Sequence, residues 1–374
     1  MTSSQYVIIG AGFAGAATAY HLALSGVKDI TILEQEAVAG FHSSGRNAAM
    51  VRQVVSDPAL AALTRGGAAF LRALPPDWPV PVGFEQNGSL LLGSGEGWEK
   101  LSRDAETARQ MGVGVESWSK DKATEFVPAL KGADFDGGVW CLTDGVVDIH
   151  ALLTGYLKAA QARGVRVRYG CSVGGFEVEQ GRVTGLSTSD GAIATETVIN
   201  ASGAWAIPIA RLAGAAQPPL HSCRRHLFVT APLAWVNRKW PFVWHITHDL
   251  YFRPEAAGLL VCPCDQQEML PGDTPTDESV TELLFEKIHR HFPALTEIAI
   301  KRSWAGLRTL SDDGRFVIGW DPKVKGFFWV AGLGGHGVTT SSAVGALAAK
   351  LIRDPHSGSG EEFSPRRFLA ATGR

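Results

Sequence analysis

The sequence has few cysteines and no excess of charge of one sign. Five cysteines in 374 residues are too few for a disulfide framework, and an odd number leaves one unpaired, so we expect a reducing compartment and a cytoplasmic location. Lys and Arg total 35 against 37 for Asp and Glu, which gives a net charge of −2. Nothing in this balance favours nucleic acid or an anionic membrane as a partner, and we expect a small molecule instead.

Long hydrophobic runs are also scarce, and only one segment is apolar enough to be considered as a possible membrane span. Residues 6–24 are almost all apolar and would suit a short span or the core of a signal peptide. No Lys or Arg precedes them, as a secretory signal requires, and three regularly spaced glycines lie inside the run. A buried strand followed by a buried helix explains both facts, so we expect no transmembrane segment, with the membrane reading as the alternative.

The remaining composition is that of a large globular chain. Hydrophobic residues make up 45% and charged residues 19%, which excludes a disordered or fibrous protein. A chain of 374 residues exceeds what one hydrophobic core usually holds, so we expect two domains. The 43 glycines and 11 tryptophans indicate close backbone approaches and aromatic-walled cavities.

The first 34 residues have the pattern of a βαβ unit. Residues 6–9 form a β-branched run that ends at a glycine, residues 13–25 are alanine-rich and predict a helix, and residues 29–33 predict a second strand. The three elements together have the usual length of such a unit, roughly 30 residues.

A glycine motif joins the first strand to this helix. Gly10 and Gly12 would let the backbone approach a pyrophosphate at the helix N-terminus, and Gly15 would let the helix pack closely on the strand. Glu34, at the end of the second strand, could accept hydrogen bonds from ribose hydroxyls. This context predicts an adenine dinucleotide site, although glycines that merely tighten a packed turn are the alternative.

A second glycine segment near the other end of the chain favours FAD over NAD. Residues 330–340 read Val-Ala-Gly-Leu-Gly-Gly-His-Gly-Val-Thr-Thr and lie between a predicted strand at 327–331 and a predicted helix at 341–352. A helix N-terminus here could stabilise the negative charge of a reduced flavin. An ordinary turn between strand and helix is the alternative. From residue 354 onward we expect a loose tail.

Five segments in this order resemble the FAD-dependent D-amino-acid oxidase and dehydrogenase superfamily, which includes glycine and sarcosine oxidases. They are Ile9–Gly15, Gly40-Phe-His-Ser-Ser-Gly-Arg46, Asn200-Ala-Ser-Gly-Ala-Trp205, Trp304-Ala-Gly-Leu-Arg308 with Asp313-Gly314 behind it, and Gly332–Gly337. The resemblance extends almost from end to end. Within the superfamily it is strongest to the bacterial D-arginine dehydrogenases.

The resemblance implies an α/β fold in which two domains interleave. A Rossmann-like FAD-binding domain would comprise residues 1–82, 145–218 and 311–374. An α+β substrate-binding domain built on a mostly antiparallel sheet would comprise residues 83–144 and 219–310. FAD would be bound non-covalently, because no cysteine stands in residues 304–309, where sarcosine oxidases attach their flavin.

The resemblance also implies further contacts with the cofactor. Besides Gly10, Gly12, Gly15 and Glu34, these would come from Ser43, Ser44 and Arg46 along the pyrophosphate and isoalloxazine, from Val173 at the adenine, from Gly203 in the cofactor cleft, and from Gly332, Gly334, Gly335 and Thr339 near the C-terminus.

Five residues would surround the substrate. By resemblance, Arg308 clamps the substrate carboxylate, Tyr251 adds a second donor, Arg225 lies nearby, and the Gly335 carbonyl faces the amine. A guanidinium suits this task because its planar fork of donors matches a carboxylate. Arg52 could form a second anion site. Surface ion pairs for the arginines, and a core position with a satisfied hydroxyl for Tyr251, are the alternatives.

Some positions depart from the relatives. Met50, Arg52 and Val55 replace a histidine, a threonine and a tyrosine of the D-arginine enzymes, and Arg52 would discourage a cationic substrate side chain if it faces the pocket. Thr339 stands where sarcosine oxidases carry a carboxylate-binding lysine, which argues against a plain sarcosine oxidase.

Two further groups of residues attract attention without changing this interpretation. His245, His248 and His336 have aromatic neighbours and are candidate pocket residues, although a satisfied buried histidine is the commoner case. Cys262-Pro-Cys264 has no second cysteine pair at zinc spacing, so we expect no metal site.

The predicted function is FAD-dependent oxidation of the Cα–N bond of an amino acid, preferably a D-amino acid. Hydride transfer to the flavin would give an imine, which water hydrolyses to a 2-oxo acid and ammonia. Oxygen or a quinone would then accept the electrons. The alternatives are a glycine- or sarcosine-type secondary amine oxidase, a non-catalytic FAD-binding subunit of a larger complex, and an NAD-dependent dehydrogenase.

Overall fold

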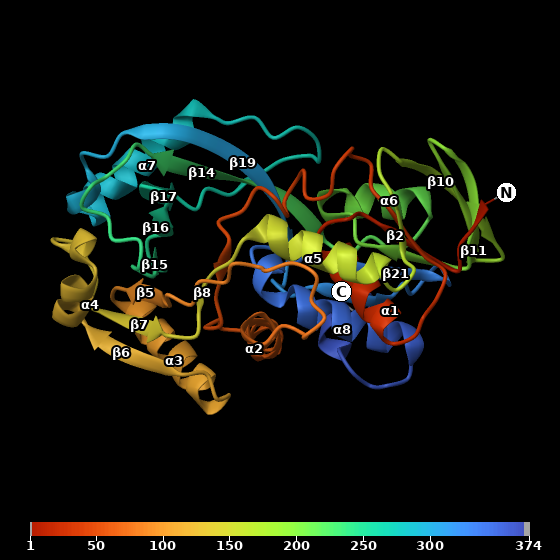
Figure 1. Cartoon of the computed structure of the whole chain (residues 1–374), viewed down its shortest axis with the longest axis horizontal. Coiled ribbons are helices and arrows are strands. Elements are labelled where there is room, and N and C mark those ends of the chain that lie inside the picture. The colour runs from red at the N-terminus through yellow and green to blue at the C-terminus, as the bar shows by residue number, and fades with distance from the viewer. Residues whose placement is uncertain (1, 370–374) are drawn as a thin grey trace.

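Two large β-sheets organise the computed structural model, which describes residues 2–369 (Figure 1). A six-stranded sheet and its helices lie in one half, and a nine-stranded sheet lies in the other. The long strands β14 (Leu220–Thr230) and β19 (Ile300–Ser311) belong to the nine-stranded sheet and reach from its far end toward the middle of the molecule (Figure 1).

The six-stranded sheet is parallel except at one edge, where its first two strands are antiparallel. Its order is β20 (Val317–Trp320), β21 (Phe327–Ala331), β13 (Thr197–Asn200), β2 (Tyr6–Ile9), β3 (Ile30–Leu33) and β9 (Arg166–Arg168). These strands come from the start, the middle and the end of the chain. The predicted Rossmann-like sheet is therefore confirmed.

Four helices pack around this sheet. They are α1 (Phe13–Leu24), α2 (Pro58–Arg72), α5 (Ile149–Gln161) and α8 (Gly337–Arg353). Glycine allows α8 its close contacts, because a Cβ at Gly345 would lie 2.5 Å from the Ala17 carbonyl oxygen of α1. The apolar run at residues 6–24 thus forms β2 and a helix packed between neighbours, and no described helix is both long and apolar enough to span a membrane.

The nine-stranded sheet is antiparallel except where β15 pairs with β5, which confirms a mostly antiparallel sheet for the second half. Besides β14 and β19 it contains β5 (Ser89–Gly93), β6 (Val115–Ser119), β7 (Gly137–Cys141), β15 (Phe242–His245), β16 (Leu250–Glu255), β17 (Gly258–Cys262) and β18 (Gln267–Glu268). The helices α3 (Glu96–Gln110), α4 (Lys120–Phe126) and α7 (Glu278–His291) belong to this half, with the short turns η1 (Pro128–Leu130) and η3 (Pro293–Leu295).

Smaller elements complete the fold. A four-stranded sheet joins β1 (Thr2–Ser3), β12 (Gly191–Ala194), β11 (Arg182–Thr188) and β10 (Val173–Glu179), and a two-stranded one joins β4 (Met50–Val51) to β8 (Gly145–Val146). The strands β10 and β11 form a hairpin, and Gln180 and Gly181 both adopt positive φ in its two-residue turn. The turn η2 (Gly203–Trp205) leads into α6 (Ala206–Leu212).

Two local predictions, the start of the last helix and the loose tail, were wrong. The helix predicted at 341–352 begins four residues earlier, at Gly337, because the β-branched residues 338–340 are buried within it. The strand β5 begins at Ser89, directly after Gly88 with its φ of +81°.

The predicted loose tail is partly ordered by packing. Residues 361–368 form the turns η4 (Glu361–Phe363) and η5 (Pro365–Phe368). Phe363 is 2% exposed, and Arg367 pairs with Asp313 at 2.7 Å. Residues 370–374 of the predicted tail lie outside the described residues. The exact domain boundaries stay a prediction. Each segment predicted for the FAD-binding domain contributes strands to the six-stranded sheet, and each segment predicted for the substrate-binding domain contributes strands to the nine-stranded sheet.

Candidate active site

A cavity of about 360 Å³ is lined by residues from both large sheets. It adjoins the carboxyl ends of β2, β3, β13 and β21, which is the usual ligand-binding edge of a parallel sheet. Most of the predicted site residues line it, namely Gly10, Gly12, Glu34, Ser43, Ser44, Arg46, Val173, Gly203, Arg225, Tyr251, Arg308, Gly332, Gly334 and Gly335. Gly15, Arg52 and Thr339 do not.

The N-terminus of α1 opens onto the cavity through the first glycine motif. Gly10 has a φ of +102°, and a Cβ there would lie 2.6 Å from the Ala201 carbonyl oxygen. A Cβ at Gly12 would lie 2.8 Å from Ser44 Oγ, which accepts a 3.0 Å hydrogen bond from the Phe13 N–H. Only glycine fits these positions without displacing a neighbour, so the backbone stays accessible to an anion at the helix N-terminus.

Gly15 packs against the turn that carries the motif and does not line the cavity, so a cofactor contact for Gly15 stays a prediction. A Cβ there would lie 1.9 Å from the Gly10 carbonyl oxygen, so any larger residue would push α1 away from the turn that carries the motif.

Glu34 is a buried acid at the end of β3, 9% exposed. Its Oε2 accepts the Ala11 N–H at 2.9 Å, and its Oε1 accepts the Glu36 N–H at 3.0 Å. Each carboxylate oxygen has a further lone pair. The side chain is therefore fixed in position and able to accept from ribose hydroxyls.

The loop at residues 40–49 forms another wall. Ser43 Oγ donates to the Leu307 carbonyl at 2.6 Å, which ties the loop to β19. Asn47 Nδ2 donates to the Ser44 carbonyl at 2.8 Å. The Arg46 guanidinium lies over the Phe41 ring and makes neither a side-chain hydrogen bond nor an ion pair within residues 2–369. Its charge is free to meet an anionic ligand.

The second glycine segment brings another helix N-terminus to the same cavity. Gly332 and Gly334 adopt φ values of +72° and +54°, and α8 follows with no side-chain cap on its N-terminus. Gly337 and Val338, its first residues, line the cavity. Two open helix N-termini, a glycine cradle and a free arginine suit a diphosphate and the anionic edge of a flavin, so the cavity fits FAD.

Side chains from neighbouring strands form the substrate end. Arg225 on β14 is paired in register with Gly306 on β19, so Arg225 and Arg308 lie on the same face of the sheet. Tyr251 on β16 pairs with Trp244 on β15.

Three donors at this end lack acceptors among the described residues. Tyr251 is fully buried with an unpartnered hydroxyl, and Nε of Arg225 and Nε1 of Trp244 are likewise buried and unpartnered. Arg225 makes one hydrogen bond, from Nη2 to Gln266 Oε1 at 3.2 Å. Burial raises the pKa of Tyr251 well above its usual value, so this phenol is a donor at neutral pH. Donors without acceptors around a cavity favour an anionic ligand.

Arg52 and Thr339 contact each other just behind this wall. The Arg52 N–H donates to Thr339 Oγ1 at 3.1 Å, and the Arg52 guanidinium lies 4.3 Å from the ring centroid of Trp244. Burial, and then the charge of Arg308, lower the pKa of Arg52 to about 10, against the influence of Asp144. Thr339 is 3% exposed and holds the strand β4 in place. A cofactor contact for Thr339 stays a prediction.

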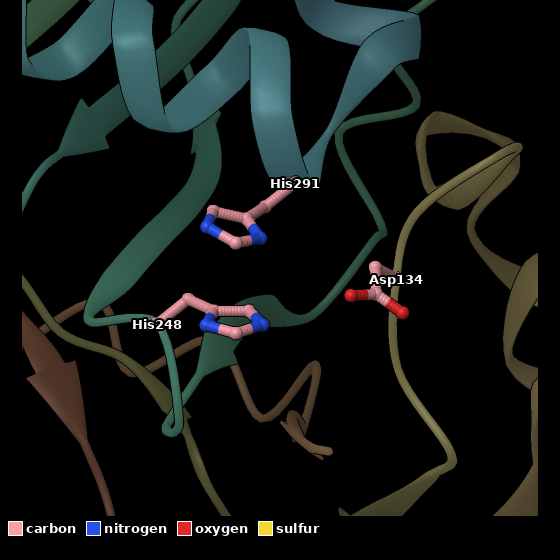
Figure 2. A group of neighbouring side chains, drawn as sticks. All are labelled: Asp134, His248 and His291. Atoms are coloured by element: carbon pink, nitrogen blue, oxygen red, sulfur yellow. The ribbon is translucent and has the colours of Figure 1, made fainter.

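The candidate pocket histidines His245, His248 and His336 do not line the cavity, whereas His42 does. His248 and His291 stack face to face beside Asp134, with ring centroids 3.6 Å apart and planes 17° apart (Figure 2). His245 Nε2 donates to the Asp134 carbonyl at 2.7 Å.

The histidine cluster as arranged does not suit a metal ion. An imidazole binds a metal through a lone pair in the ring plane, about 2.1 Å from zinc. Because the planes of His248 and His291 are nearly parallel, an ion at that distance from both would lie far out of each plane. The five cysteines, all buried and free, include Cys262 and Cys264.

Trp244 is a cavity residue that the sequence pattern did not reveal. It follows a stretch broken by Pro and Trp, so no alternation marked its strand. The signal that could have revealed it is the turn at residues 246–249. A hairpin predicted around this turn sets the register of β15 against β16 and so pairs Trp244 with Tyr251.

Comparison with known proteins agrees with this architecture. The chain is 25% identical to sarcosine dehydrogenase of Homo sapiens over 371 residues, covering 94% of this chain but only 40% of that protein. L-proline dehydrogenase from P. horikoshii is 26% identical, covers 99% of both chains and superimposes with a TM-score of 0.89. Glycine oxidase from Geobacillus kaustophilus shares the fold, with 23% identity, coverage of 98% and 99%, and a TM-score of 0.84. The family model described as "FAD dependent oxidoreductase" matches residues 5–351, and the chain belongs to this family.

Proposed function

We propose that the protein oxidises the Cα–N bond of an amino acid, preferably a D-amino acid, with FAD held non-covalently. The observation that carries this proposal is the set of unpartnered donors on Arg225, Tyr251 and Trp244, next to Arg308, at one end of a cavity that fits FAD. A carboxylate is the anion that such donors would recognise on an amino acid. Bound FAD would supply the two-electron acceptor for the hydride that leaves Cα.

The residues at the substrate end would bind and orient the substrate. Arg308 offers a planar fork that matches both carboxylate oxygens, and Tyr251 can add an O–H donor. Arg225, on the same face of the sheet, adds positive charge. Gly335 packs where a Cβ would lie 3.1 Å from Arg308 Cζ, so its backbone is close to the carboxylate site. Its carbonyl could accept a hydrogen bond from the amine. Holding the substrate in one orientation is the main contribution these residues make to the rate.

No base is required in this proposal. Among the described residues that line the cavity, Glu34 is the only carboxylate, and it is fixed near the glycine motif. Tyr251 has a raised pKa and cannot accept a proton at neutral pH. The substrate amine can lose its proton to water, and activity should rise with pH until that proton is gone.

A secondary amine substrate is the second candidate. Sarcosine and proline, the substrates in the names of two of the similar proteins, both carry a substituted amine. The preference for a D-amino acid rests on the resemblance at residues 40–46 and 304–308. Formation of formaldehyde or of a cyclic imine, in place of ammonia, would identify the secondary amine reaction.

The test is reduction of the bound flavin without oxygen. The purified protein is mixed with D- and L-amino acids, glycine, sarcosine and L-proline, and the visible absorbance is followed. Bleaching by a D-amino acid and not by its L-enantiomer supports the proposal, and readmitted air distinguishes an oxidase from a dehydrogenase. Bleaching by sarcosine or proline alone supports the second candidate. A yellow protein that no compound bleaches contradicts both and points to a non-catalytic FAD-binding subunit.

A further inference from the structure

Buried arginines in the nine-stranded sheet ordinarily have a carboxylate partner in this protein. Arg224 pairs with Asp277 at 2.6 Å, and Arg253 pairs with Glu255 at 2.7 Å, each arginine being 8% exposed. Pairing is expected, because a buried charge without a counter-charge is strongly unfavourable.

Three arginines around the substrate end have no such partner. Arg52, Arg225 and Arg308 form no ion pair with any described residue. Arg225 is 7% exposed, as buried as the paired arginines, and Arg52 and Arg308 are partly buried. The α-carboxylate of one amino acid would balance only one of these three charges.

The acids nearest to them are already occupied. Asp265 accepts from His226 Nδ1 at 2.6 Å and from the His226 N–H at 2.9 Å. Asp144 accepts from Ser89 Oγ at 2.7 Å and from Gln53 Nε2 at 2.8 Å. These acids reduce the local positive potential but leave the guanidinium donors unpaired.

The thiol of Cys262 responds to these charges. Burial opposes its ionisation, while a hydrogen bond with Cys264 and the charges of Arg225 and Arg308 lower the pKa of Cys262 below its usual value. With one α-carboxylate bound by Arg308, the Arg52 guanidinium still has no anionic partner among the described residues.

Arg52 lies next to the substrate end of the cavity. It does not itself line the cavity, but it directly follows the strand β4 (Met50–Val51), whose Met50 does. The Arg52 guanidinium lies on the face of Trp244, another cavity residue. The charge of Arg308 also lowers the pKa of Arg52.

We propose that the substrate carries a second carboxylate, which Arg52 binds beside Trp244 while Arg308 and Tyr251 bind the first. The substrate class is then an amino dicarboxylate, either an acidic amino acid or an amine bearing two carboxylalkyl groups. This inference rests on the proposed function and narrows its substrate.

The first test compares dicarboxylates with their neutral isosteres in the wild-type holoenzyme. Anaerobic flavin reduction is measured with aspartate, glutamate, asparagine and glutamine in both enantiomers, and with iminodiacetate against sarcosine. We expect a KM for the dicarboxylate lower than that of its isostere by roughly tenfold or more. Equal or better reduction by the neutral compounds overturns the inference and leaves the proposed function intact. No reduction by any amino acid overturns both.

The second test uses Arg52→Gln, with Arg52→Lys as the conservative variant. In Arg52→Gln, KM for the dicarboxylate should rise roughly tenfold or more while KM for the neutral isostere changes little, and lysine should restore part of the difference. The matched control is Arg302→Gln, because exposed Arg302 also lies over a tryptophan ring, that of Trp304 at 5.0 Å.

A purely structural role for Arg52 gives a different result. Loss of the contact with Trp244 would then raise KM for both substrates equally, or lower kcat for both, and would contradict the inference. Flavin content and thermal unfolding are recorded for each variant. If Arg52→Gln does not fold, the comparison of dicarboxylates with their isosteres in the wild type decides alone.

Discussion

The two halves of the cavity are built in different ways. In the half with the parallel sheet, the site consists of backbone at glycine turns and helix N-termini, all close to strand ends. In the half with the antiparallel sheet, it consists of side chains from the middle of strands, whose neighbours are set by register. The first kind of site depends on local geometry, and the second on the pairing of distant segments. Substitutions should therefore act differently in the two halves.

The largest effect is expected where a side chain would collide with backbone. Gly15→Ala places a Cβ 1.9 Å from the Gly10 carbonyl oxygen, so α1 must move away from the glycine motif. We expect the bound flavin of the purified protein to fall by roughly tenfold or more. The control is Gly272→Ala, where nothing lies within 4 Å of the added Cβ. A yellow Gly15→Ala protein with normal flavin content would contradict the predicted packing role.

On the substrate side the largest effect is expected for Arg308. Arg308→Gln removes a charge that would be paired with the substrate carboxylate, and kcat/KM should fall by roughly 30- to 1000-fold. Flavin content should stay close to that of the wild type, which separates this half from the other. Arg302→Gln, on the same strand but exposed, is the control. Loss of flavin together with activity would show that the two halves are not separable in this way.

A smaller effect is expected at Tyr251. Tyr251→Phe removes one donor and should lower kcat/KM by roughly 3- to 10-fold. Its hydroxyl is buried without a partner, so the same change should leave the melting temperature unchanged or raise it. A marked fall in the melting temperature would mean that the hydroxyl has a structural partner.

The smallest effect concerns stability at acid pH in the histidine cluster of Figure 2. Burial lowers the pKa of His245 to about 4 from its ordinary value of 6.5, and burial also lowers the pKa of His248 and His291. The unfolded chain then binds more protons than the folded one, so the stability present above pH 6.5 is lost as the pH falls toward 4.

Replacing one member of the cluster should reduce this acid sensitivity. Between pH 7 and pH 5, His291→Phe should lose less in melting temperature than the wild type, by roughly 2 to 4 °C. The control is His289→Gln, because His289 is exposed on the same helix turn. An equal loss in all three proteins would show that the stacked rings do not titrate in this range.

The same contrast explains what could be predicted from the sequence. The glycine motif, Glu34 and the strands around them were predictable because each depends on residues close in the chain. The positions of Trp244 and of Arg52 were not predictable, because the strand β15 pairs with β5 from 153 positions earlier and the register of that pair is not a local property. The prediction of a loose tail was wrong for a similar reason, because Phe363 is buried by contacts with residues distant in the sequence, such as Phe316.

Recognition of a carboxylate next to the flavin is the central feature of the proposed site. The most direct measurement is anaerobic flavin reduction by a reactive amino acid and by the amine that lacks only its carboxylate. We expect the amino acid to bleach the flavin and the amine, at the same concentration and pH, to reduce it at least about 100-fold more slowly. Equal rates for the two compounds would contradict carboxylate recognition.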